Sequence, residues 1–248
     1  MMKRKTVTRL FNYCQVFLIV LVLVLTVSSC NKDDFSDTDI FPMNIGNIWA
    51  YERNSYIWGY IEENGKEIYD YYLIDVGKFV QKIETYENIE GYTGYTIDKN
   101  EQITTLLNLD NKGNVTQTQF FQNKFVHSSI LYKKHVKKDD FWTVKSICGY
   151  GAGDYSTWEI QYSCIATDTL ITTSVGDFKC IGYKYRTFVP PSIGYAYVDY
   201  EEYFSGNMGL VKRIIYKNGG YSSYFQEWCV AYEEHILIGY KLKLNPHR

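Results

Sequence analysis

The side chains that could carry out chemistry in this sequence are four histidines, six cysteines and 28 acidic residues. No histidine lies in a His-Glu-x-x-His pair, and none neighbours a candidate nucleophile at a recognisable elbow. The cluster Glu233-Glu234-His235 has metal-binding residue types, but neighbouring residues of a strand point to opposite faces. We therefore predict no metal site, no cofactor and no catalytic residue of a known type.

The amino-terminal 29 residues show the three parts of a signal peptide. Four basic side chains and no acid occur in the first nine residues, an apolar run covers residues 16–27, and the small pair Ser28-Ser29 follows. The run is shorter than the roughly 20 apolar residues with which a helix spans a bilayer. We predict that residues 1–29 form a cleaved signal.

The tetrapeptide Val27-Ser28-Ser29-Cys30 resembles a bacterial lipobox. This resemblance implies that a signal peptidase cuts before Cys30, that the thiol carries a diacylglycerol, and that the new amino terminus is acylated. One acyl chain binds a bilayer only marginally, whereas two or more give stable anchoring. Cys30 is therefore the predicted lipidation site. Through this lipid anchor, the membrane is a predicted partner. An uncleaved anchor and a secreted protein cut elsewhere are the alternatives.

Residues 30–40 hold four aspartates among small polar residues and offer little apolar surface to bury, which favours a solvated tether. Within them, Asn31-Lys32-Asp33-Asp34 resembles the short acidic export signal that follows the lipidated cysteine in surface lipoproteins of the Bacteroidota. The resemblance implies an outer-membrane protein that is exposed at the cell surface. An anchor that faces the periplasm is the alternative.

The mature chain is acidic and rich in aromatic residues. Residues 1–29 contain four basic and no acidic side chains, so their removal leaves 22 basic and 28 acidic ones, a formal charge of −6. Nucleic acid is not a predicted partner, because phosphate binding needs clustered lysine and arginine. With 25 tyrosines, 13 phenylalanines and only 4 prolines, the composition favours strands. We predict an all-β fold: one mostly antiparallel β-meander domain over residues 41–248, as a curved sheet, a sandwich or an open barrel.

The clearest turn is Asn64-Gly65, since this dipeptide tolerates the positive φ angles of a type I′ hairpin. Counting outward pairs Glu63 with Lys66, Glu62 with Glu67, Ile61 with Ile68, Tyr60 with Tyr69, Trp58 with Tyr71 and Tyr56 with Leu73. This register gathers large rings on one face, and exposed rings stack on sugars or meet proteins. The predicted binding residues are therefore Trp58, Tyr60, Tyr69 and Tyr71. The alternative is that these rings fill the core or cover a solvated sheet face.

Alternation with a period of two continues in residues 157–164, where Trp158, Ile160, Tyr162 and Cys164 share one face. Residues 120–134 lack clean alternation. They are predicted to hold one short helix or a long connection.

Four cysteines remain in the mature domain once Cys14 leaves with the signal and Cys30 is acylated: Cys148, Cys164, Cys180 and Cys229. In an oxidising compartment they are candidates for disulfides, and four cysteines allow three pairings. Buried free thiols are the alternative, since cysteine often serves as a small apolar core residue.

The order of landmarks resembles a group of Bacteroidota lipoproteins of undefined activity. These open the mature domain with a motif like residues 41–51 and place a second tryptophan after a charged turn, as in residues 138–142. Segments like residues 173–180 and 203–212 follow. The sequence departs from the pattern at Lys138-Asp139-Asp140, where these relatives carry Val-Gly-Asp. The resemblance implies a fold and no chemistry.

These features favour a lipid-anchored surface binding or accessory protein, which meets a glycan or an envelope protein through an aromatic sheet face. A lipid carrier or envelope assembly protein is the first alternative, and it requires a pocket lined by leucine, isoleucine and phenylalanine. A hydrolase with an unrecognised carboxylate pair is the second, because the fold sets the spacing of two carboxylates.

Overall fold

The computed structural model describes six stretches of the chain: residues 40–83, 85–99, 102–149, 155–188, 197–218 and 232–243. The all-β prediction is confirmed, since these stretches form strands and contain no helix. Accordingly, no helix in them is long and apolar enough to cross a membrane. The strands are β1 (Ile48–Glu63), β2 (Lys66–Lys82), β3 (Tyr86–Ile89), β4 (Tyr92–Lys99), β5 (Ile103–Leu109), β6 (Val115–Phe121), β7 (Lys124–Tyr132), β8 (Phe141–Gly149), β9 (Tyr155–Thr173), β10 (Gly176–Phe188), β11 (Tyr197–Ser205), β12 (Gly209–Asn218) and β13 (Tyr232–Lys241).

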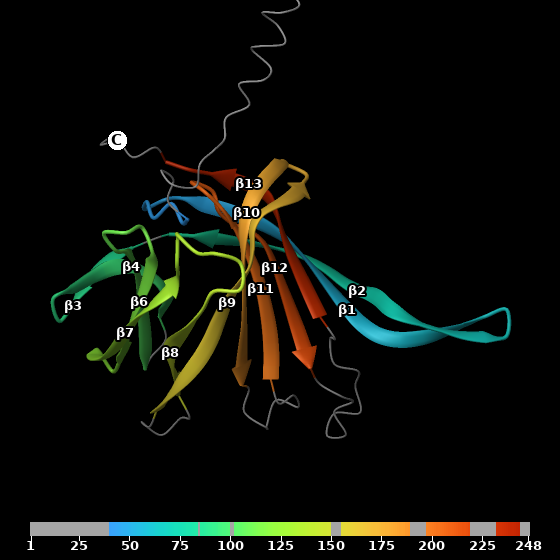
Figure 1. Ribbon diagram of the computed structural model, residues 1–248, viewed down its shortest axis with the longest axis horizontal. Helices are drawn as coiled ribbons and strands as arrows, with labels where there is room; N and C mark the ends of the chain where they lie inside the picture. Colours follow the sequence, from blue (N-terminus) through green and yellow to red (C-terminus); the bar gives the residue numbers. More distant parts are fainter. Residues whose placement is uncertain are drawn as a thin grey trace, which may run out of the picture. The chain divides into compact units, whose positions relative to one another are not determined.

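The strands form two antiparallel sheets (Figure 1). The larger sheet has the order β2-β1-β13-β12-β11-β10-β9-β8, and the smaller sheet has the order β3-β4-β5-β6-β7. Most strands pair with their neighbours in sequence, which is the predicted meander. Among the described strands, only the β1–β13 pair joins segments far apart in the chain. The larger sheet ends at β2 and β8, so its described strands do not close into a barrel.

The β1–β2 hairpin has the predicted register. Asn64 and Gly65 have φ angles of 55° and 73°, which are the left-handed conformations that a type I′ turn requires. All six predicted cross-strand pairs are present. β1 pairs with β13 only from Ile48 to Tyr56, so the distal half of the hairpin extends beyond the rest of the larger sheet (Figure 1).

Along β9 the predicted alternation is confirmed, because Ile160 and Tyr162 are buried while Glu159 and Gln161 are exposed. This pattern directs one face of the strand into the core.

The prediction for residues 120–134 was wrong, since they hold the end of β6 and all of β7 instead of a helix or a long connection. Two features hide the alternation. A bulge between Gln119 and Phe120 changes which residues face the core. The turn Gln122-Asn123 adopts φ angles of 51° and 63° without a glycine to mark it.

The first tryptophan motif is held in the core by residues 203–212. Trp49 and Tyr51 are both buried. The indole N–H of Trp49 donates to the carbonyl oxygen of Met208 at 2.6 Å, and the hydroxyl of Tyr51 donates to the carbonyl oxygen of Leu210 at 2.9 Å. Two segments that are far apart in the sequence therefore form one packing unit.

Side chains of the smaller sheet cover the β8 edge of the larger sheet. The amide of Gln117 donates to the carbonyl oxygen of Lys145 at 2.7 Å, and Nε2 of His127 lies 2.8 Å from the same oxygen. The backbone N–H of Ile147 donates to the side chain of Gln119 at 2.9 Å. Covering a strand edge in this way blocks pairing with another chain.

Candidate binding face and interior cavity

One face of the larger sheet gathers aromatic rings from four strands. Along β1, Trp49 and Tyr51 point into the core, so Tyr56 and Trp58 point to the opposite side. The cross-strand register places this same side on β2, β13 and β12. We call this surface the outer face and define it by Tyr56, Trp58, Tyr71, Tyr216 and Tyr232.

The rings of the outer face differ in how much surface they offer to a ligand. Tyr56 and Tyr232 stack face to face, with centroids 4.3 Å apart and planes 9° apart, so each covers one face of the other. Tyr71 lies 4.9 Å from Tyr232 at 83°, and Trp58 lies 4.8 Å from Tyr71 at 65°. Trp58 and Tyr71 are each 46% exposed. These two rings therefore form the open part of the face.

Aliphatic side chains extend this apolar surface along β2. Leu73, Ile74, Val76 and Val80 are 51–63% exposed. β2 ends the strand order of the larger sheet, with β1 as its described partner. The β8 edge is covered by polar side chains, whereas the β2 edge carries exposed apolar groups. A long apolar edge strand is a template for pairing with another chain.

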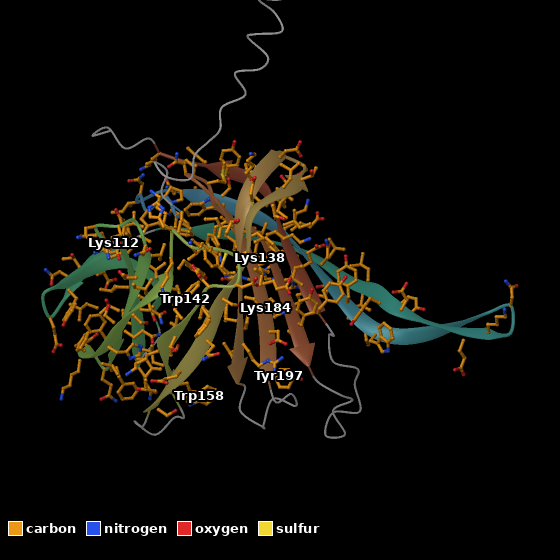
Figure 2. The ribbon with its side chains drawn as sticks, in the orientation of Figure 1. Lys112, Lys138, Trp142, Trp158, Lys184 and Tyr197 are labelled. Carbon is orange, nitrogen blue, oxygen red and sulfur yellow. The ribbon has the colours of Figure 1, made fainter. Side chains whose placement is uncertain are left out.

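Ion pairs border the outer face on strands β10 to β13. They are Lys184–Glu201 at 3.0 Å, Arg186–Asp199 at 2.6 Å and Lys212–Glu234 at 2.5 Å. Figure 2 shows Lys184 on β10 and Tyr197 on the neighbouring strand β11. Partly exposed pairs add little stability, but a polar rim around an apolar centre is typical of a protein interface.

The structure brings together two of the four predicted binding residues. Trp58 and Tyr71 are in contact on the outer face. Tyr60 and Tyr69 are opposite each other in the register, but their side chains lie outside what the structure describes. Cys30 also lies outside the described residues, as do the signal, residues 1–29, and the rest of the tether up to residue 39.

Cys164 and Cys180 are buried free thiols. Burial raises the pKa of the Cys180 thiol to about 12, so this thiol stays protonated and unreactive at neutral pH. The side chain of Cys148 and all of Cys229 lie outside the described residues. Cys148 and Cys229 are therefore the two cysteines whose disulfide pairing stays a prediction.

A buried network that was not predicted from the sequence joins the two sheets: an ion pair within the larger sheet accepts a hydrogen bond from the smaller one. Glu202, which is 0% exposed, accepts hydrogen bonds from Nε of Arg213 at 2.6 Å and from the hydroxyl of Tyr132 on β7. Burial and the nearby Glu202 carboxylate raise the pKa of Tyr132 well above its usual value, so this hydroxyl remains a donor. The signal was available: Glu202 alternates with the apolar residues Val198 and Phe204 on the buried face of β11.

A partly open cavity of about 400 Å³, which we call the interior cavity, adjoins this network, because Tyr132 and Arg213 are both part of its wall. The apolar part of the wall includes the residue types that the carrier alternative requires, namely Phe41, Ile83, Leu107, Leu131, Phe204 and Leu210. Pockets that bind small molecules have volumes of about 300–1,000 Å³ and mostly apolar walls.

Glu233 and His235 point to the inner side of the larger sheet, whereas Glu234 pairs with Lys212 on the outer side. The three side chains do not converge, and no other group of three metal-binding side chains meets among the described residues. Glu233 interacts with His235 at 3.4 Å and with Lys217. These two contacts outweigh burial and lower the pKa of Glu233 to about 2.

The lowered pKa predicts acid sensitivity. Because the folded pKa of Glu233 lies below its ordinary value of 4.5, its contribution to stability is complete above about pH 5 and is lost as the pH falls toward 2. The contribution is of the order of 3 kcal/mol at about 1.4 kcal/mol per pKa unit. Urea unfolding should show that the free energy of unfolding decreases less between pH 6 and pH 3 for Glu233→Gln than for the wild type. Equal losses would contradict the assignment.

No known protein-family model matches the chain, and no curated protein is significantly similar to it. Two crystal structures are similar at low identity. One is a predicted lipoprotein from Parabacteroides distasonis ATCC 8503, with 14% identity, 82% of this chain and 99% of the other covered, and a TM-score of 0.34. The other is a predicted exported protein with a YmcC-like fold from Bacteroides fragilis NCTC 9343, with 13% identity, 83% and 100% covered, and a TM-score of 0.32. At these scores the likeness assigns neither a family nor an activity to this chain.

Proposed function

We propose that this chain is a lipid-anchored accessory protein of the bacterial outer membrane, facing the cell surface, and that it binds a partner protein through the outer face and the β2 edge. The single observation that supports binding most strongly is the pair of exposed rings, Trp58 and Tyr71, beside the exposed aliphatic row of β2. Tryptophan and tyrosine are the residues that most often dominate the binding energy of an interface.

A protein partner fits this surface better than a glycan. Stacking on sugars uses the flat faces of rings, but Tyr56 and Tyr232 each cover one face of the other, and the exposed rings Trp58 and Tyr71 meet edge to face. The neighbouring Leu73, Ile74 and Val76 are aliphatic and lie on an edge strand. An extended apolar segment of a partner can add to such an edge by main-chain hydrogen bonds and place its side chains against the face.

The anchor is supported by the lipobox-like residues 27–30 and is tested by replacing the cysteine. Cys30→Ser is expected to move most of the chain from the membrane fraction to the soluble fraction, because serine cannot form the thioether that carries the lipid. Cells are grown with an alkyne-labelled fatty acid and then fractionated, which measures both the lipid label on the chain and its distribution between the membrane and soluble fractions. Cys14→Ser, within the signal, should change neither. A Cys30→Ser chain that keeps its label would contradict the proposed anchor.

The partner is tested by photo-cross-linking in intact cells. A photoreactive benzoylphenylalanine in place of Tyr71 should give one adduct of defined mass, which mass spectrometry identifies. The matched control places the same group at Phe141, which is 72% exposed at the β8 edge. Adducts of the same mass at both positions would contradict a specific surface. No protein adduct, together with retardation of the chain by a polysaccharide gel, would favour a glycan instead.

A further inference from the structure

We propose that the interior cavity binds a single acyl chain that ends in an anionic group, and that Arg213 recognises the anion. This site is separate from the five rings that define the outer face, although Val80 of the adjoining β2 row is also part of its wall. Trp49, Tyr132 and Phe204 in its wall are buried core residues, whereas Trp58 and Tyr71 point to the other side of the larger sheet.

The size and wall of the cavity fit a chain of moderate length. Its volume is about 400 Å³. A water molecule takes up about 30 Å³ of liquid and a methylene group is similar in size, so the cavity accommodates roughly ten carbons with a small head group. Leu107, Val115, Leu131 and Leu210 provide apolar contacts and are all buried.

Arg213, an arginine in the cavity wall, has hydrogen-bond donors that Glu202 does not use. Nε of Arg213 donates to Glu202, but the two terminal nitrogens make no hydrogen bond with any described residue. The Arg213 side chain is 25% exposed although the Glu202 side chain beside it is 0% exposed. Arg213 is part of the cavity wall, and we infer that its terminal nitrogens face the cavity. A guanidinium fork binds a carboxylate or a phosphate through two parallel hydrogen bonds.

The cavity opens near the carboxyl end of β2. Of the wall residues there, Val80 and Lys82 are exposed, whereas Ile83 is buried. We therefore place the anionic group at Arg213 inside the cavity and the end of the chain toward Val80.

The test uses the full lipidated chain in phospholipid nanodiscs and two photoreactive probes that differ only in the head group. Diazirine-labelled decanoate should label peptides that contain Leu131 or Leu210 about fivefold more strongly than diazirine-labelled decanol, because only the acid pairs with the guanidinium. Unlabelled decanoate and lysophosphatidylglycerol are compared as competitors. Stronger competition by decanoate indicates that the ligand is a free fatty acid. Stronger competition by lysophosphatidylglycerol indicates that it is a lysolipid.

Two variants separate the anion site from the cavity. Arg213→Lys keeps a charge for Glu202 but lacks the fork, so the preference for the acid over the alcohol should fall to within about twofold. Val115→Phe fills the cavity and should reduce labelling by both probes about fivefold. If Val115→Phe does not fold, Leu131→Met is the second variant. It conserves the volume of the side chain, so labelling by both probes must stay unchanged. Equal labelling by acid and alcohol in the wild type, or label only outside the wall, would overturn the proposal.

Discussion

Replacing Glu202 with alanine is expected to lower the free energy of unfolding by about 3–5 kcal/mol. The carboxylate is fully buried and both of its oxygens are in use, one by Arg213 and one by Tyr132. Its removal leaves the partly buried Arg213 guanidinium without its counter-charge and leaves the buried Tyr132 hydroxyl without an acceptor. Both groups then bear desolvation costs that the ion pair had offset.

The control for Glu202→Ala is its neighbour on β11. Glu201 points to the other side of the sheet and pairs with Lys184, whose side chain is 44% exposed. Glu201→Ala should cost at most about 1 kcal/mol, because partly exposed pairs contribute little. Urea unfolding followed by circular dichroism measures both variants. Similar decreases in the free energy of unfolding for Glu202→Ala and Glu201→Ala would show that the buried network does not hold the sheets together.

Trp49→Ala is expected to cost a further and independent 3–5 kcal/mol or so, the usual range for removing a large buried aromatic side chain. The indole is 1% exposed, packs against Phe41 at 5.2 Å and donates to Met208 at 2.6 Å. The variant removes this packing and leaves the partly buried carbonyl oxygen of Met208 without its donor. Because Trp49 connects β1 to residues 203–212, the thermal midpoint should also fall.

Trp58→Ala, on the same strand, provides the contrast. Trp58 is 46% exposed, so its replacement should change the free energy of unfolding by about 1 kcal/mol or less. Calorimetry on both variants gives the comparison. If Trp58→Ala destabilises the chain as much as Trp49→Ala, then Trp58 is a core residue and not a binding residue.

Features that depend on neighbouring residues could be predicted from the sequence. Asn64-Gly65 sets the turn and therefore the register of the β1–β2 hairpin, because each pair follows from the one before it. The same register placed Trp58 against Tyr71. The alternation of buried and exposed residues along β9 could be predicted because its buried positions are uniformly apolar.

Features that depend on distant parts of the chain could not be predicted. The pairing of β1 with β13 joins residues more than a hundred positions apart, and no local pattern encodes it. The alternation along β11 marks Glu202 as a core position, but Arg213 and Tyr132 come from other strands, so the partners of this charge could not be predicted. The exposure of β2 likewise follows from its place at the end of the sheet order.

The proposed binding surface is tested most directly by the affinity of the cross-linked partner for the soluble chain, residues 31–248. Trp58→Ala should weaken binding about thirtyfold, which corresponds to about 2 kcal/mol for an aromatic residue at the centre of an interface. Phe141→Ala removes a ring that is more exposed than Trp58, at the opposite edge of the sheet, and should leave the affinity within about twofold. Equal affinities of the wild type and Trp58→Ala would contradict the assignment of the outer face as the binding surface.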